Sequence, residues 1–369
     1  MGVMWPPPRG TWFHELQEHA RSAYLRAVPQ AALRVVDGPV RRVAELARRV
    51  AVAPAYVRQR CAVWTGTCRG EPTRIALWGK PGSPRALFQL VFDAPPVATW
   101  ADHPRTLPAV LRDPTAIAAD ADLLLAETTP AFAGLFRRRG FLIVPNAVWY
   151  GADVGVVRAA LVHPSNSLSS DLCRVRRSRY RAERWSSTPD DARLFYERYV
   201  MAHAHARFGA GAIGYELEEF TRLVRAGTLI AVRRPEEALP DAMALVVMRG
   251  GTSWFVAVGT RDGDRAIVEA GGFAAIYRAA IAFADEQGAR WIDCGQCSPW
   301  RGDGIGRYKA KWGFHPVPGF PLTLEYGVKV VRPASAAARV LVEEGLLVRE
   351  GRAIVELGRA RALAVQQAS

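Results

Sequence analysis

The stretch 228–260, TLIAVRRPEEALPDAMALVVMRGGTSWFVAVGT, contains three apolar runs rich in Val, Ile and Leu. The runs cover Thr228–Arg233, Ala242–Arg249 and Ser253–Thr260. Gly250–Gly251 joins the last two runs, and a glycine pair between apolar runs is a strong signal for a tight β-hairpin. The stretch therefore predicts three successive antiparallel strands.

Helices are predicted on both sides of these strands. The segment Ser187–Asp191, STPDD, is a typical helix start, because a hydroxyl can cap the first turn and two acids complement the helix dipole. We expect this helix to reach about Phe208 and a second one to cover Tyr215–Ala226. After the strands, Phe273–Gln287 carries apolar residues at helical spacing, and Gly288 is suited to end that helix.

Two motifs follow in the last part of this region. A buried strand is expected at Arg290–Cys294, a short irregular or helical stretch around Gly302–Lys311, and a final strand at Leu322–Val331. The motifs are WIDCG at 291–295 and YKAKWG at 308–313. Together with the element order, they resemble the GNAT (Gcn5-related N-acetyltransferase) superfamily, and most closely its FemABX-like and BioF2-like acyltransferase branch. The resemblance covers roughly residues 170–330 and implies that two neighbouring strands splay apart to admit an acyl donor.

The first half of the chain shows a related pattern. GFLIVP at 140–145 is echoed by GFHPVP at 313–318, and each copy precedes an aromatic run ending in Tyr-Gly. The FemABX resemblance implies such a duplication, so we expect an α/β (α+β) fold with two tandem GNAT-like lobes, each a mixed, largely antiparallel sheet flanked by helices. Four apolar runs are expected to form strands of the first lobe, namely Arg74–Trp78, Ala86–Phe92, Leu123–Ala126 and Phe141–Trp149.

These patterns predict four segments along the chain. They are an N-terminal basic helical segment at 1–73, a degenerate GNAT-like lobe at 74–165, a GNAT-like acyltransferase lobe at 166–331 and a C-terminal helical tail at 332–369. The polar stretch around PSNSLSS at 164–170 is the expected junction between the lobes. The basic helices of the first segment either pack on the protein's own core or form a surface for tRNA or anionic lipid.

Composition limits the class of protein and of partner. The chain has 369 residues, 50% of them apolar, with a formal net charge of +14. Such a charge favours anionic partners such as nucleotide phosphates or nucleic acid. Arginine dominates, as in proteins of GC-rich bacteria, so each of the four lysines, Lys80, Lys309, Lys311 and Lys329, is an unusual choice. Five cysteines without a disulfide spacing and the lack of a long apolar run favour a cytoplasmic protein, for which peripheral membrane contact stays open.

The resemblance implies that Lys309 is the catalytic cation that stabilises the tetrahedral intermediate of acyl transfer. Tyr308 and Asp303 are expected to shape its pocket, and Lys311 is expected to be solvated. Candidates for the general base are His203, Glu216 and Glu219, each of which could instead belong to a packed or solvated helix face.

A phosphate-bearing donor has two candidate contacts. Gly271 and Gly272 precede the helix that starts at Phe273, and helix N-termini bind phosphate through their amide groups, although these glycines could also form a simple turn. The usual GNAT phosphate loop is absent. The densest positive cluster, which we expect to be extended, binds phosphate or is a solvated connector; it includes Arg174, Arg176, Arg177 and Arg179.

We therefore expect an acyltransferase that moves an acyl group to a small-molecule or peptide amine. Acyl-CoA is the favoured donor and aminoacyl-tRNA the alternative, in which case tRNA is a partner. No metal is expected in either reaction. A non-catalytic protein that binds a phosphate ligand or nucleic acid is the remaining alternative, because a fold does not dictate activity.

Overall fold

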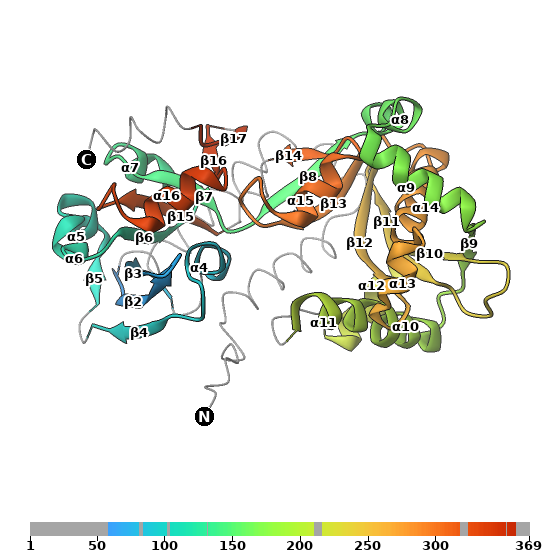
Figure 1. Cartoon of the computed structure of the whole chain (residues 1–369), viewed down its shortest axis with the longest axis horizontal. Coiled ribbons are helices and arrows are strands. Elements are labelled where there is room, and N and C mark those ends of the chain that lie inside the picture. Colours follow the sequence, from blue (N-terminus) through green and yellow to red (C-terminus); the bar gives the residue numbers. More distant parts are fainter. Residues whose placement is uncertain are drawn as a thin grey trace. The chain divides into compact units, whose positions relative to one another are not determined.

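The computed structural model describes residues 58–80, 84–101, 104–130, 132–209, 216–317, 324–351 and 353–358, without the side chains of Arg58, Thr115 and Phe208. Residues 1–57, and with them most of the predicted basic helical segment, lie outside this description. The described chain divides into two compact units (Figure 1). The second unit comprises Trp149–Gln296 and Arg307–His315, and the first unit contains the rest.

The first unit is built on a six-stranded sheet with the order β4-β2-β3-β6-β15-β7. The neighbours β3 and β6 are parallel, and the other pairs are antiparallel. Its strands are β2 (Cys61–Cys68), β3 (Glu71–Trp78), β4 (Val97–Trp100), β6 (Leu123–Thr128), β7 (Leu142–Pro145) and β15 (Glu325–Val330). Two small two-stranded ladders complete the unit, β1 (Arg58–Gln59) with β5 (Arg105–Thr106) and β16 (Leu347–Glu350) with β17 (Ala353–Glu356).

Helices cover both faces of this first sheet. Apolar side chains of α4 and α16 join one core with Ile75 and Leu77 of β3, and those of α5, α6 and α7 join a second core with Ala76 and Trp78. Alternate residues of one strand thus face opposite cores, as the two-residue period of a strand requires. The helices are α4 (Arg85–Val91), α5 (Leu107–Arg112), α6 (Thr115–Ala118), α7 (Ala133–Arg137) and α16 (Ala336–Glu343).

The second unit contains a seven-stranded sheet with the order β14-β8-β13-β12-β11-β10-β9. The pairs from β9 to β12 are antiparallel, and β12 and β13 are parallel. The strands are β8 (Val148–Asp153), β9 (Arg181–Trp185), β10 (Thr228–Arg233), β11 (Ala242–Arg249), β12 (Thr252–Thr260), β13 (Trp291–Cys297) and β14 (His315–Val317).

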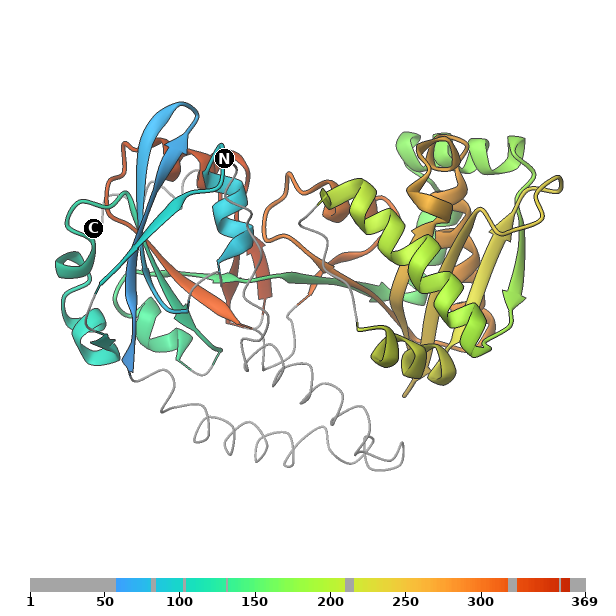
Figure 2. The same cartoon turned by 90° about the horizontal axis from the view of Figure 1, so that it is seen from below.

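Two layers of helices enclose this second sheet, and they can be followed in Figure 2. Phe195, Tyr199, Phe220 and Val224 of the first layer pack on β10 and β11. This layer consists of α10 (Pro189–Phe195), the π-helical turn η1 (Tyr196–Met201), α11 (Ala202–Phe208) and α12 (Leu217–Ala226). The other layer is centred on α14 (Gly272–Glu286), which contacts α8 (Val154–Val162), α9 (Asn166–Arg177) and α13 (Arg265–Glu269). The 3-10 turn η3 (Arg261–Gly263) and α15 (Gly304–Ala310) complete the elements described.

The mixed α/β class, with two mixed sheets flanked by helices, is confirmed, but two strands lie in unexpected sheets. The expected last strand of the second lobe is β15, which pairs with β6 and β7 in the first sheet. In turn β8, expected in the first lobe, lies between β14 and β13 in the second sheet. Both strands are buried on both faces, so their apolar pattern fits either sheet and cannot identify the pairing partner. The units therefore do not follow the expected boundary at 165/166.

Three further expectations are corrected. The run Ala86–Phe92 forms helix α4, because Leu87, Phe88 and Val91 share one helical face that is buried. Residues 61–68, assigned to the N-terminal helical segment, form strand β2 of the first sheet. In the described part of the expected C-terminal helical tail, helix α16 is followed by the β16–β17 hairpin, and Val340, Leu346 and Val348 are buried in the core of the first unit.

In the part of the chain that the structure describes, none of the helices combines the length and the apolar character needed to cross a bilayer.

Candidate functional site

The two parallel strands of the second sheet separate after a short ladder. Thr252–Trp254 of β12 pair with Trp291–Asp293 of β13, but β12 continues to Thr260 and β13 to Cys297. A β-bulge at Val256, two residues after the end of the ladder, shifts the register between β11 and β12. Bulges bend a strand and re-aim its side chains. The divergence agrees with the splay that the sequence resemblance implied.

Lys309 lies near this divergence. The lysine is on the last turn of α15, is only 4% exposed, and donates a hydrogen bond from Nζ to the carbonyl oxygen of Gln296 at 2.9 Å. The ammonium is 5.9 Å from the ring centroid of Tyr150, and a Cβ built on Gly295 would lie 3.9 Å from it. Among the described residues no carboxylate is within ion-pair distance of this ammonium. A buried positive charge with one carbonyl acceptor is well suited to bind a developing oxyanion.

Tyr308, the residue before Lys309, belongs to an aromatic cluster between α14 and α15. Its ring contacts Phe273 at 5.3 Å and Tyr277 at 5.1 Å between centroids. The phenolic oxygen is buried, and this burial raises the pKa of Tyr308. Tyr308 is therefore a neutral, packed side chain that fixes the helix carrying Lys309.

Lys311 is not the solvated lysine that was expected. Its ammonium forms an ion pair with Asp171 of α9, and the two side chains are 17% and 7% exposed. The same carboxylate also binds Arg174, and Lys311 lies 4.1 Å from the ring centroid of Tyr308. No sequence pattern predicts this ion pair, because Asp171 and Lys311 are 140 residues apart.

His203 lies beside the start of α14, at the end of β12. Nδ1 is 3.0 Å from Oγ1 of Thr260, and the imidazole stacks on Phe273 with 5.2 Å between ring centroids. Burial, assisted by the positive charge of Arg207, lowers the pKa of His203 to about 4. The imidazole is therefore neutral at pH 7, and the same burial makes it a weaker base than an exposed histidine.

The other two candidate bases are not brought near Lys309. Glu216 and Glu219 belong to the N-terminus of α12, whose buried residues pack on the sheet face opposite to the one that α14 covers. Glu216 is the exposed N-cap residue of this helix. His203 belongs to α11 of the same helix layer, but its ring contacts Phe273 of α14, which in turn contacts Tyr308.

Asp303 and Asp293 have local structural roles. The carboxylate of Asp303 accepts a hydrogen bond from the amide of Gly306 at 2.7 Å, so it caps the helix that carries Lys309. The carboxylate of Asp293 accepts a hydrogen bond from the amide of Gly295 at 2.8 Å and stabilises the part of β13 in which Gly295 has a φ of 76°.

The glycine pair before α14 is closely packed. Both Gly271 and Gly272 are buried. A Cβ on Gly271 would lie 3.0 Å from Cβ of Arg174, and one on Gly272 would lie 2.6 Å from Cγ2 of Ile267. These contacts with α9 and α13 explain both glycines without a ligand, so they favour the turn over the phosphate site.

The arginine cluster is partly helical rather than extended. Arg174, Arg176 and Arg177 end α9, and Arg179 precedes the edge strand β9. The six arginines of the cluster are exposed, and only Arg174 has a carboxylate partner among the described residues. The other five are exposed residues at the end of α9 and along the following chain to β9, and we call them the arginine surface: Arg176, Arg177, Arg179, Arg181 and Arg184.

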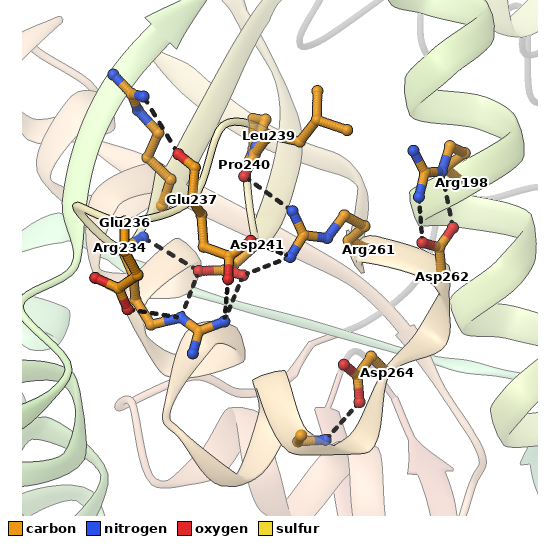
Figure 3. A network of polar contacts seen from close by, with 12 residues as sticks. Arg198, Arg234, Glu236, Glu237, Leu239, Pro240, Asp241, Arg261, Asp262 and Asp264 are labelled. Atoms are coloured by element: carbon orange, nitrogen blue, oxygen red, sulfur yellow. Dashed lines mark hydrogen bonds and ion pairs between the residues drawn. The ribbon is translucent and has the colours of Figure 1, made fainter.

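A network of ion pairs that no sequence motif predicts lies just after the last residues of β10 and β12 (Figure 3). The fully buried carboxylate of Asp241 binds Arg234, with 2.9 Å between Nε and Oδ2, and Arg261, with 3.3 Å between Nη2 and Oδ1. Arg261 also binds Glu237 at 2.7 Å. Each guanidinium is neutralised here, so the network joins two strand ends and leaves little charge for a ligand.

Possible metal ligands and thiols occur in several places within the described ranges. No three His, Cys, Asp or Glu side chains there come together in a way that could hold a metal ion. Cys294 and Cys297 are buried thiols that take part in no disulfide, and burial raises the pKa of Cys294 to about 11. Such a thiol is inert at neutral pH.

No protein-family model and no curated protein matches the chain. Solved structures similar to it include the C-terminal domain of a putative lysylphosphatidylglycerol synthetase from Agrobacterium fabrum, at 14% identity and a TM-score of 0.34, covering 84% of each chain. FemX has 11% identity and a TM-score of 0.38, over 73% of this chain and 84% of its own. A GCN5-related N-acetyltransferase from Sphaerobacter thermophilus has 13% identity and a TM-score of 0.32, over 72% and 79%.

Proposed function

We propose that the protein is a GNAT-fold N-acyltransferase that moves an acyl group from a phosphate-bearing donor to an amine. The observation that carries the proposal is the ammonium of Lys309, which is buried beside Gly295 where the β12–β13 ladder has ended. A cytoplasmic location, where acyl-CoA and aminoacyl-tRNA are both found, belongs to the same proposal.

The proposed chemistry requires no covalent enzyme intermediate. The acceptor amine attacks the carbonyl carbon of the donor thioester or ester, and the carbonyl oxygen gains negative charge. Lys309 stabilises this oxyanion, which interacts with the ammonium more strongly than the neutral carbonyl does. The intermediate collapses with cleavage of the donor C–S or C–O bond, which releases CoA as its thiolate or the 3′-oxygen of tRNA. The amine nitrogen loses a proton in this step, and neutral His203 is the proposed acceptor of that proton.

Acyl-CoA is our first choice of donor, and the arginine surface supports aminoacyl-tRNA as the second. Five exposed arginines without a carboxylate partner in the described structure would bind a polyphosphate chain, and that binding would weaken as salt rises. A single CoA would engage fewer of these charges than a tRNA, so the salt dependence of binding distinguishes the two donors.

Native mass spectrometry of the purified protein, followed by transfer assays, tests the proposal. The assays use acetyl-CoA and radiolabelled bulk aminoacyl-tRNA as donors, with a panel of amino acids, diamines and short peptides as acceptors. We expect a co-purified or added donor to bind and its acyl group to appear in an amide product. Binding of CoA or tRNA without transfer to any acceptor would favour the non-catalytic alternative, and binding of neither would overturn the proposal.

A further inference from the structure

Two lysines stand two residues apart in the motif YKAKWG, and they have different surroundings. Lys309 reaches the carbonyl of Gln296 and has no carboxylate partner among the described residues. Lys311 is paired with the buried carboxylate of Asp171. The chain thus neutralises one lysine of the motif and leaves the charge of the other uncompensated.

The helix that carries Lys309 needs contacts from outside to hold its place. α15 has seven residues, and helices this short are not stable alone in water. On one side the bond from Lys309 to Gln296 holds the end of this helix, and on the other side Asp171 holds Lys311 just after the helix. Hydrogen bonds from the amide of Lys311 to Arg307 and from that of Trp312 to Lys309 connect the two points through one helical turn.

Asp171 is itself fixed from three directions. Its carboxylate binds Arg174 one turn later in α9, its helix packs on α14, and Lys311 lies over the ring of Tyr308, which contacts α14 as well. An ion pair this buried is costly to break, because the remaining partner keeps an uncompensated charge. Loss of the Asp171 charge would therefore force Lys311 toward solvent and move the turn to which Lys309 belongs.

We infer that Asp171 is a positioning residue: through its ion pair with Lys311, it holds the last turn of α15 so that the Lys309 ammonium stays buried beside Gln296. The inference rests on the proposed function only for its effect on catalysis, since the placement of Lys309 can be measured without any substrate. A carboxylate paired with Lys309 itself would neutralise the positive charge that the proposed chemistry needs. Asp171 avoids this because it pairs with Lys311, two residues further along the chain.

Competitive trace labelling of amines with acetic anhydride, read by mass spectrometry, measures the reactivity of each lysine in the full chain. We expect Asp171→Asn to raise the labelling rate of Lys309 on the order of tenfold, because a displaced ammonium becomes accessible. Lys80 and Lys329 serve as internal controls, since both are in the first unit and should keep their rates. Asp171→Glu, which retains the charge, should restore most of the protection.

The double variant Asp171→Asn with Lys311→Met separates positioning from general loss of structure. Removal of both charges leaves no unpaired buried lysine, so Lys309 should return to within about threefold of its wild-type labelling rate. Where acyl transfer is measurable, kcat of Asp171→Asn should fall about tenfold with little change in KM, and the double variant should recover.

Unchanged labelling of Lys309 in Asp171→Asn would overturn the inference. A double variant in which Lys309 is labelled as fast as in Asp171→Asn, or faster, would overturn it as well. Faster labelling of Lys80 and Lys329 together with Lys309 would also overturn it, because it would show general unfolding. If the labelling rate of Lys309 changes as expected but no substitution of Lys309 alters acyl transfer, the positioning role of Asp171 is correct and the proposed function is wrong.

Discussion

The six-stranded sheet contains the parallel strand pair β3–β6, and the seven-stranded sheet contains the parallel pair β12–β13. The two ladders end differently. In the first unit β3 and β6 pair from Ile75 to Trp78, the last residue of β3. In the second unit the β12–β13 ladder stops at Trp254, six residues before the end of β12. Similar strand pairs thus form a ladder that reaches the end of β3 in one unit and a ladder that stops early in the other, and the early stop is where the proposed function places the donor.

The two parallel ladders also differ in the residue that follows four positions after the first paired residue of β6 or β13. In β6 it is Glu127, a buried carboxylate that accepts a hydrogen bond from the amide of Lys80 at 2.9 Å. In β13 it is Gly295, beside the ammonium of Lys309. The first sheet thus has a carboxylate at this position, in electrostatic contact with Lys80, whereas the second has a glycine beside a lysine ammonium without a carboxylate partner among the described residues.

The largest effect is expected from cutting the chain at the boundary that the sequence suggested. A fragment covering residues 166–331 lacks β8, which separates β14 from β13, and it leaves β15 without β6 and β7. We expect this fragment to show no cooperative urea unfolding by circular dichroism, unlike the full chain. A sharp transition and a dispersed NMR spectrum from the fragment would mean that the lobes fold separately.

The Asp241 network should contribute much of the stability of the second unit. Asp241→Ala leaves Arg234 and Arg261 without their buried partner, so the free energy of unfolding should fall by about 4 kcal/mol. Asp262→Ala is the matched control, because its ion pair with Arg198 is exposed and should be worth about 0.5 kcal/mol. Urea titrations measure both, and equal losses would show that burial is not what distinguishes the two pairs.

The two units should respond to pH in opposite directions. Burial lowers the pKa of His203 to about 4, so the unfolded chain takes up the proton first and stability is lost as the pH falls from about 6.5 to about 4. Burial outweighs Arg349 and raises the pKa of Glu325 in the first unit to about 7, so stability is lost as the pH rises from about 4.5 to about 7.

Replacing each group by glutamine tests these signs. On acidification, the free energy of unfolding should fall by about 2 kcal/mol less in His203→Gln than in the wild type. On raising the pH, it should fall by about 2 kcal/mol less in Glu325→Gln than in the wild type. Urea unfolding at pH 4.5 and pH 7 measures both differences. The same sign of change in both variants would contradict the burial of one of the two groups.

The sequence predicted the parts of the fold that depend on local pattern. β10 and β11 have the predicted bounds, and α14 starts and ends one residue earlier than expected, because apolar period and glycine position determine such elements. The sheet membership of β8 and β15 could not be predicted, since a strand that is apolar on both faces fits many neighbours. Among 49 basic residues no pattern could identify Lys311 as the partner of Asp171, or two arginines as partners of Asp241.

The most direct test of the account compares Lys309→Met with Lys329→Met in the transfer assay. The two lysines have similar contacts, because Lys329 also donates to a backbone carbonyl, at 3.1 Å, and lies 5.7 Å from an aromatic ring centroid, but it belongs to the first sheet. We predict that Lys309→Met lowers kcat on the order of a hundredfold, about 3 kcal/mol, with little change in KM, whereas Lys329→Met changes neither by more than about twofold. Equal and small effects of the two substitutions would contradict the claim that the second unit carries the catalytic cation.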